Sequence, residues 1–209
     1  MKKVMLLAIM AIMGLQAQAQ IVSSRSSMVT RQVVEKVSTG WSTIGIEYLP
    51  SKLSYDGGSE SFSGLAFNYT NATSLTQSFP LFLEWGIGAQ YSYHDEDDVS
   101  TKWVSLKVPV NIIYDFQLPN TSINIDPFVG LKLRGNVWGE IKNDYYDESW
   151  NLFDEDEGDA SRFQIGWNIG VKARFNNKFF VGIAYGSDFS EFTDDTTINE
   201  VSLSLGLVF

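Results

Sequence analysis

The stretch with the clearest chemical potential is "YSYHDEDD", residues 91–98, which places Ser92 two positions before His94. Residues two apart on an extended strand share a face, so this hydroxyl and imidazole could act as nucleophile and general base. His94 is the sole histidine of the chain, and no third residue stands out to orient its ring as a catalytic site requires. We therefore expect His94 to be a solvated residue beside acids, and the protein not to be an enzyme.

A second candidate site is the acidic run "DEDEGD". Asp154, Asp156 and Asp159 offer the hard oxygen atoms that Ca²⁺ prefers. Their spacing does not match the twelve-residue calcium loop, which also needs a distal glutamate. Charge runs usually stay in water, so we expect a solvated loop without metal and a protein without cofactor. The chain has no cysteine, which excludes disulfides, thiolate catalysis and cysteine-bearing zinc sites.

Charge and the N-terminus limit the class of protein. The formal charge of the 209 residues is -10, which argues against a nucleic-acid partner because phosphate binding needs a basic surface. Residues 1–19 combine Lys2 and Lys3 with an apolar run and a small-residue ending, the form of a secretory signal peptide. We predict cleavage after Ala19 and a periplasmic leader at 20–40. No later segment holds about 18 uninterrupted apolar residues, so any membrane crossing must use strands.

Alternation of apolar and polar residues is the main structural signal of the rest of the chain. Such a period of two is typical of strands with one apolar face, and most segments approach the ~10 residues of a tilted transmembrane strand. The eight segments are 43–49, 63–69, 80–94, 103–116, 123–137, 163–175, 179–186 and 201–209.

Two architectures fit eight such strands: a soluble barrel or sandwich with the apolar face inside, or an outer-membrane barrel with the polar face inside. Many glycines, Gly86, Gly88 and Gly130 among them, share the polar parity, where they would make room for charged side chains in a narrow lumen. Four predicted loops hold 20 of the 25 acidic residues and alternate with three connections that hold none. The loops are 51–61, 94–101, 139–161 and 187–200. The sequence thus predicts an all-β, eight-stranded antiparallel transmembrane β-barrel at 41–209, with short periplasmic turns and longer extracellular loops, in the outer membrane of a Gram-negative bacterium.

Charges on the polar parity are expected to pair inside the lumen, because an eight-stranded barrel is only wide enough for side chains and buried charges need partners. We expect Glu47 and Glu84 to be the acids most central to Lys107, Lys132 and Arg174. A plugged barrel then follows, with an open channel as the alternative. The full predicted network is Glu47, Glu84, Lys107, Asp115, Asp126, Lys132, Arg134, Lys172 and Arg174.

Aromatic residues mark two predicted membrane interfaces, since rings gather at both margins of an apolar band in outer-membrane lipid. The rings beside the short turns are Phe116, Phe175, Phe179 and Phe209, and those toward the loops are Tyr48, Tyr91, Tyr93 and Tyr185. The longest acidic loop also holds aromatic residues, which either contact a protein or sugar ligand or pack the loop onto itself. These are Tyr145, Tyr146, Trp150 and Phe153.

The stretches "LKVPVNIIYDF", "NKFFVGIAYG" and "VSLSLGLVF", together with the predicted signal peptide, resemble the small outer-membrane β-barrels of Bacteroidetes described as porin-like or PorT-like. The resemblance covers residues 41–209. It implies that the terminal Phe209 is part of a signal read by the barrel-assembly machinery. The leading functional hypothesis is a non-enzymatic surface barrel that displays loops for surface interaction or supports membrane integrity. Its alternatives are a transport channel, a lipid- or peptide-cleaving barrel enzyme, and a secretion-system accessory.

Overall fold

The computed structural model describes residues 40–209 except 56, 77, 97–98, 144, 147, 155–159 and 194. The predicted signal peptide and residues 20–39 of the predicted leader therefore lie outside the described residues. No helix in the described part is long and apolar enough to cross a membrane.

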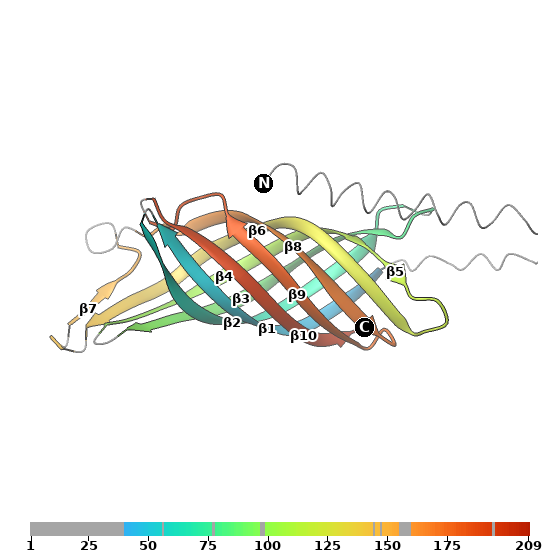
Figure 1. Cartoon of the computed structure of the whole chain (residues 1–209), viewed down its shortest axis with the longest axis horizontal. Coiled ribbons are helices and arrows are strands. Elements are labelled where there is room, and N and C mark those ends of the chain that lie inside the picture. Colours follow the sequence, from blue (N-terminus) through green and yellow to red (C-terminus); the bar gives the residue numbers. More distant parts are fainter. Residues whose placement is uncertain are drawn as a thin grey trace, which may run out of the picture. The chain divides into compact units, whose positions relative to one another are not determined.

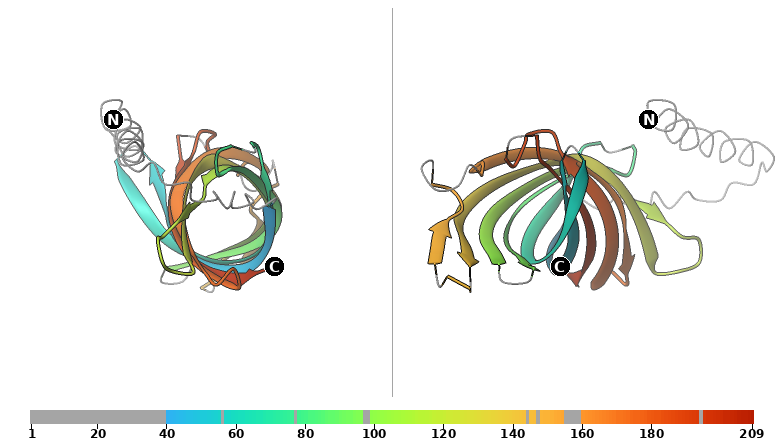
Figure 2. Two further views of the ribbon diagram at one scale, coloured as in Figure 1. Left: turned by 90° about the vertical axis from the view of Figure 1, so that its right-hand side faces the viewer. Right: turned by 60° about the vertical axis from the view of Figure 1, so that its left-hand side comes forward.

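A closed ring of antiparallel strands forms the described part of the chain. Each ring strand pairs with its neighbours along the chain, and β1 pairs with β10 to close the ring, as the end-on view of Figure 2 shows. The short strands β5 and β7 pair only with β6, outside the ring. The ring strands are β1 (Gly40–Tyr55), β2 (Gly58–Ser74), β3 (Leu81–Glu96), β4 (Val99–Tyr114), β6 (Ile123–Asn143), β8 (Phe163–Phe175), β9 (Phe179–Asp188) and β10 (Thr197–Val208); β5 is Phe116–Gln117 and β7 is Glu148–Asn151.

The barrel has its apolar face outside. Leu65 and Ile46 are 60% and 55% exposed, whereas Gln164 and Glu84 are buried against the lumen. Because a strand turns successive side chains to opposite faces, the alternation in the sequence separates these two surfaces directly. An apolar exterior around a polar interior is the arrangement of a transmembrane barrel.

The two ends of the barrel differ in their connections (Figure 1). The turn end carries the connections at 75–80, 115–122 and 176–178, the last built on the positive φ of Asn176 and Asn177. The loop end carries the longest connection, 144–162, which includes β7, and the segment 189–196.

The first two predicted loops are shorter than expected. β1 continues to Tyr55 before β2 begins at Gly58, and β3 continues to Glu96 before β4 begins at Val99. Outside lipid a strand needs no apolar face, so its backbone can go on pairing through polar residues. The predicted loops at 51–61 and 94–101 are therefore mostly hairpin ends.

Two prolines interrupt the wall. The β1–β10 ladder lacks pairs between Tyr48–Leu203 and Ser51–Glu200, and Pro50 lies in this gap. The β3–β4 ladder is interrupted in the same way beside Pro109. Proline has no N–H to donate, so it leaves one side of a ladder unpaired.

Apolar clusters fill the lumen at both ends, which the sequence pattern did not predict. Their members have the inward parity or belong to loops that fold over the opening. The turn-end cluster consists of Trp41, Ala72, Phe82, Ile113, Phe128, Phe180 and Val208, and the loop-end cluster consists of Phe62, Trp103, Leu152, Phe153, Ala160, Phe192 and Ile198.

Candidate functional site in the lumen

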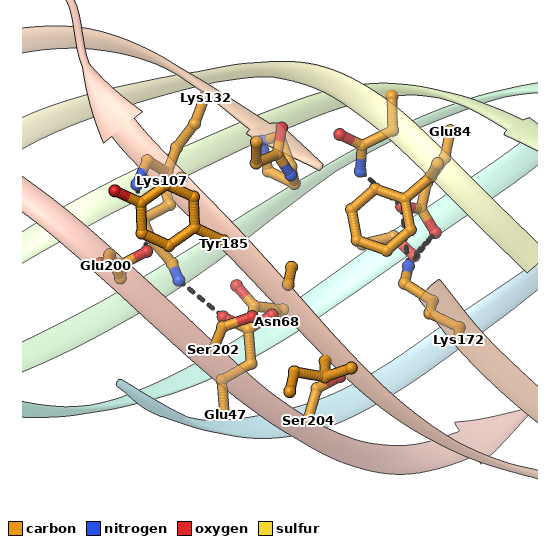
Figure 3. Close-up of a pocket in the computed structure, with 18 residues that line it drawn as sticks. Glu47, Asn68, Glu84, Lys107, Lys132, Lys172, Tyr185, Glu200, Ser202 and Ser204 are labelled. Carbon is orange, nitrogen blue, oxygen red and sulfur yellow. Dashed lines mark hydrogen bonds and ion pairs between the residues drawn. The ribbon is translucent and has the colours of Figure 1, made fainter. Parts of the chain in front are cut away.

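Between the two apolar clusters, three glutamate–lysine pairs cross the lumen (Figure 3). Each pair joins strands three places apart in the ring, so it spans the interior and does not run along the wall. The distances are 2.8 Å for Lys107 Nζ to Glu47 Oε2, 3.0 Å for Lys132 Nζ to Glu200 Oε1, and 2.6 Å for Lys172 Nζ to Glu84 Oε2.

Glu84 is the most completely satisfied of these carboxylates. In addition to Lys172, Thr70 Oγ1 donates to it at 3.0 Å and Asn111 Nδ2 donates at 2.8 Å. The Lys172 ammonium lies 5.2 Å from the ring centre of Phe128 in the turn-end cluster. This pair therefore ties the charged layer of the lumen to the apolar layer below it.

Five residues form a denser network toward the loop end. Arg134 contacts Asp188 and Glu200, each at 3.1 Å, and Gln164 Oε1 accepts a hydrogen bond from Arg134 at 3.2 Å. Lys132 contacts the same two acids. The carboxylates share both cations across β6, β9 and β10, which locks these strands together.

Asp188 and Glu200 correct the charge assignment made from sequence, which counted both as loop acids. They stand at the loop-side ends of β9 and β10 and are buried. The signal was available, because Asp188 shares the parity of Gly182 and Gly186, and Glu200 shares that of Ser202. Both strands extend past the last position of the apolar alternation, and the same parity continued along them places both acids in the lumen.

Arg174 forms a separate group at the turn end. Its guanidinium contacts Asp126 and lies 2.9 Å from Asp115, and it stacks 3.6 Å from the ring centre of Trp41. Arg174 thus does not join Glu47 and Glu84, and neither does Lys132. Of the central bundle expected from sequence, Glu47 with Lys107 is the pair that the structure brings together. Parity places a charge inside, but the stagger of the strands decides which charge it meets.

A small cavity of about 70 Å³ lies among the three glutamate–lysine pairs. Asn68 Nδ2, Asn111 Oδ1 and Asn168 Oδ1 border it without a protein partner. A polar cavity of this size suits a few ordered water molecules. Glycines shape it, since a Cβ at Gly88 would clash with Asn68 and one at Gly130 with Asn111. In this layer Gly88 and Gly130 therefore make room for asparagine side chains, whereas the sequence predicted room for charged ones.

The candidate catalytic pair is divided between two environments. Ser92 is buried in the lumen and accepts a hydrogen bond from Gln90 Nε2 at 3.0 Å. The imidazole Nδ1 of His94 lies 2.8 Å from the backbone carbonyl of Ser61 on the neighbouring strand. Among the described residues no group of three or more acidic or histidine side chains is placed to hold a metal, and Asp156 and Asp159 of the calcium candidate lie outside those residues.

The aromatic residues of the longest loop separate into two groups. Phe153 is buried in the loop-end cluster, where its ring is 6.4 Å from that of Phe192. Tyr145 and Tyr146 are 74% and 67% exposed at the tip of the β6–β7 hairpin, with ring centres 4.9 Å apart. One part of the loop therefore packs into the loop-end cluster and another presents rings to solvent.

Comparison with known proteins identifies the family. The profile of the outer membrane protein beta-barrel domain matches residues 5–209. The chain belongs to this family. Its location is therefore the outer membrane, and the apolar belt faces lipid. No curated protein matches the sequence significantly.

Solved structures of small outer-membrane barrels are similar in fold. Neisserial surface protein A is 13% identical, with a TM-score of 0.55 over 80% of this chain and 97% of that chain. Ail, the attachment invasion locus protein of Yersinia pestis, is 15% identical, with a TM-score of 0.48 over 82% and 100%. The outer membrane enzyme PagL is 16% identical, with a TM-score of 0.49 over 78% and 97%. At these identities the likeness concerns the fold alone.

Proposed function

We propose that this barrel is a closed, non-enzymatic surface protein that supports the outer membrane and presents acidic extracellular loops to a partner. The observation that carries the proposal is the filling of the lumen at successive levels. An apolar cluster occupies each end, and between them the glutamate–lysine pairs cross the interior. A barrel filled in this way is a rigid element of the membrane that holds its loops at the surface.

The loop end supplies the surface for a partner. With Asp188 and Glu200 assigned to the lumen, 18 acidic residues of the sequence remain in or beside the outward connections. Tyr145 and Tyr146 stand among them on the β6–β7 hairpin. Exposed tyrosines beside carboxylates suit a protein or sugar ligand with cationic or hydroxyl groups.

Support for a non-enzymatic role comes from the contacts of Ser92 and His94, which engage Gln90 and a backbone carbonyl respectively. The matching experiment compares lipid hydrolysis by wild type and by His94→Ala. Equal activity at background level is expected. Hydrolysis that is lost in the variant would favour the enzyme.

The remaining assignments of this proposal concern targeting and assembly. We place the chain with the Bacteroidetes porin-like or PorT-like barrels, with residues 1–19 as a signal peptide and 20–40 as a periplasmic leader. Phe209 exchanges two backbone hydrogen bonds with Ser42, at 2.8 and 3.0 Å, and thereby completes the β1–β10 seam. An assembly signal at this position predicts that Phe209→Ala lowers the yield of folded barrel in the outer membrane while leaving refolding of the purified chain intact.

The test of the closed barrel is ion conductance. The purified full-length chain is inserted into planar bilayers, and an open porin in the same bilayers serves as the positive control. We expect no steady conductance from the barrel. A stable, ion-selective current from wild type would contradict the proposal and would assign transport as its function.

A further inference from the structure

A groove near the loop end opens on the outer wall of the barrel, and Tyr185 and Glu200 border both this groove and the lumen cavity. The groove has a volume of about 590 Å³ and crosses β2, β1, β10 and β9, where the β1–β10 ladder is interrupted at Pro50. Figure 1 shows these four strands side by side. The side chains that shape its outward face include Lys52, Ser54, Ser61, Tyr185 and Asn199.

The strand register places this groove at the edge of the lipid-facing belt that is nearer the loop end. The wall changes from apolar to polar within four residues along each of the strands, which marks the boundary between hydrocarbon and headgroups. The row below the groove consists of Ile183, Leu203, Tyr48 and Leu65, and the row at its level consists of Ser187, Asn199, Lys52 and Ser61.

Lys52 is the charge of this row. It is exposed, its cross-strand neighbours Ser61 and Asn199 are neutral, and none of the described residues forms an ion pair with it. Lys102, an outward lysine on β4, differs because the register places Glu140 opposite it. The ammonium of Lys52 is therefore available to an external anion.

Hydrogen-bonding groups surround this lysine in a fixed arrangement. Tyr185 Oη donates to Asn199 Oδ1 at 3.2 Å, and Asn199 Nδ2 donates to Ser54 Oγ at 2.9 Å. Glu200 also borders the groove, but its carboxylate is engaged by Lys132 and Arg134 in the lumen. Its negative charge is thus compensated and does not oppose an anion near Lys52.

We propose that this groove binds the phosphorylated sugar headgroup of an outer-leaflet glycolipid. Lys52 contacts a phosphate, and the serine and asparagine side chains bind headgroup oxygen atoms. The acyl chains continue downward over Tyr48, Ile183 and Leu203, which already face lipid. A single exposed lysine would hold free phosphate weakly, whereas a lipid adds apolar contact below the groove. The inference rests on the proposed orientation, with the loop end outside the cell, and is independent of whether the lumen conducts.

Native mass spectrometry of the full-length barrel in detergent tests this site, with diphosphorylated lipid A as the probe. Wild type should retain one lipid A molecule. Lys52→Gln should weaken retention about five- to tenfold, the loss expected for one cation near a charged membrane surface and its hydrogen bonds. Lys102→Gln is the matched control and should retain lipid A like wild type, and Lys52→Arg should preserve binding.

Two further probes separate headgroup recognition from its alternatives. Dephosphorylated lipid A should bind wild type as weakly as the diphosphorylated form binds Lys52→Gln. Inorganic phosphate should fail to displace the lipid. The proposal is overturned if Lys52→Gln retains lipid A like wild type, if Lys102→Gln loses as much, if wild type retains none, or if inorganic phosphate competes and so reveals a free-phosphate site.

Discussion

The apolar clusters at the two ends of the lumen come from different parts of the chain. Every member of the turn-end cluster, from Trp41 to Val208, belongs to a ring strand, so this closure forms as the barrel itself forms. In the loop-end cluster, Phe62, Trp103 and Ile198 belong to strands, but the other members come from the segments 144–162 and 189–196. We call the turn-end cluster the floor, because strands alone form it, and the loop-end cluster the cover, because loops supply four of its seven members.

Because of this difference, substitutions at the two ends should affect different properties of the barrel. Strand residues lose their contacts only when the ring unfolds, whereas loops can open locally at a lower free-energy cost. We therefore expect changes in the floor to lower the stability of the whole barrel. Changes in the cover should alter access and protease sensitivity more than global stability.

The largest loss of stability is expected from removal of the Glu84 carboxylate, which lies next to the floor. Glu84→Ala leaves Lys172 without its carboxylate beside Phe128, at a cost of about 4–5 kcal/mol in the free energy of unfolding. Glu47→Ala is the matched comparison and should cost less. The Glu47 side chain is 25% exposed and pairs with Lys107, whereas loss of the 1% exposed Glu84 also leaves Thr70 and Asn111 without this acceptor. Denaturant unfolding of both variants in the same lipid measures the difference; equal losses would show that burial does not govern these pairs.

A direct contrast of floor and cover comes from two phenylalanine truncations. Phe82→Ala removes a fully buried ring that packs 4.5 Å from Trp41, and should cost about 3 kcal/mol. Phe153→Ala removes a ring that is 4% exposed from the loop-end cluster. It should cost less than half as much, because its loop can open while the ring of strands stays folded. Unfolding curves give both values. If the two losses matched, the cover would be as integral to the barrel as the floor.

How far the sequence predicts this arrangement depends on which physical rule controls each feature. Strand alternation places Glu84 and Lys172 inside and Leu65 and Ile46 outside, because the two faces of a strand are separated by parity alone. Which charges meet depends on the stagger between distant strands, and parity carries no information about it. This is why Glu84 was expected beside Arg174 and is found with Lys172.

The apolar closures were missed for a related reason. Trp41, Phe82 and Ile113 share the parity of the charged residues, where apolar side chains look like exceptions to the pattern. They gather at one level of the lumen only once the strands are in register. Loop residues such as Phe153 follow no period at all, so their packing against Trp103 and Phe192 depends on how the loops fold back.

A smaller loss of stability should follow from removing the cation–π contact between Arg162 and Phe153 of the cover. The guanidinium of Arg162 lies 5.7 Å from the ring centre of Phe153. Because Arg162 is exposed, Arg162→Gln should cost about 0.5 kcal/mol and should speed protease cleavage within 144–162 rather than shift global unfolding. Limited proteolysis of folded barrels tests this, and an unchanged cleavage rate with a lowered unfolding midpoint would reverse the assignment.

The smallest effect is expected at the hairpin tip. Tyr145→Ser and Tyr146→Ser change rings that contact each other and solvent, so the stability should stay within about 0.5 kcal/mol of wild type. Thermal unfolding of the double variant measures this. A large destabilisation would mean that these tyrosines belong to the cover, and would remove the argument that they are displayed for a partner.

Closure of the lumen is tested most directly by thiol accessibility, since the native chain contains no cysteine. Ser202→Cys places a single thiol at the central cavity, and Tyr145→Cys places one at the exposed hairpin as a reference. A small, charged thiol reagent added from the outside should label the Tyr145→Cys barrel rapidly and leave the Ser202→Cys barrel unlabelled. A barrel that combines Ser202→Cys with Phe153→Ala should become labelled. Equally fast labelling at both positions in otherwise wild-type barrels would contradict a lumen closed at its outer end.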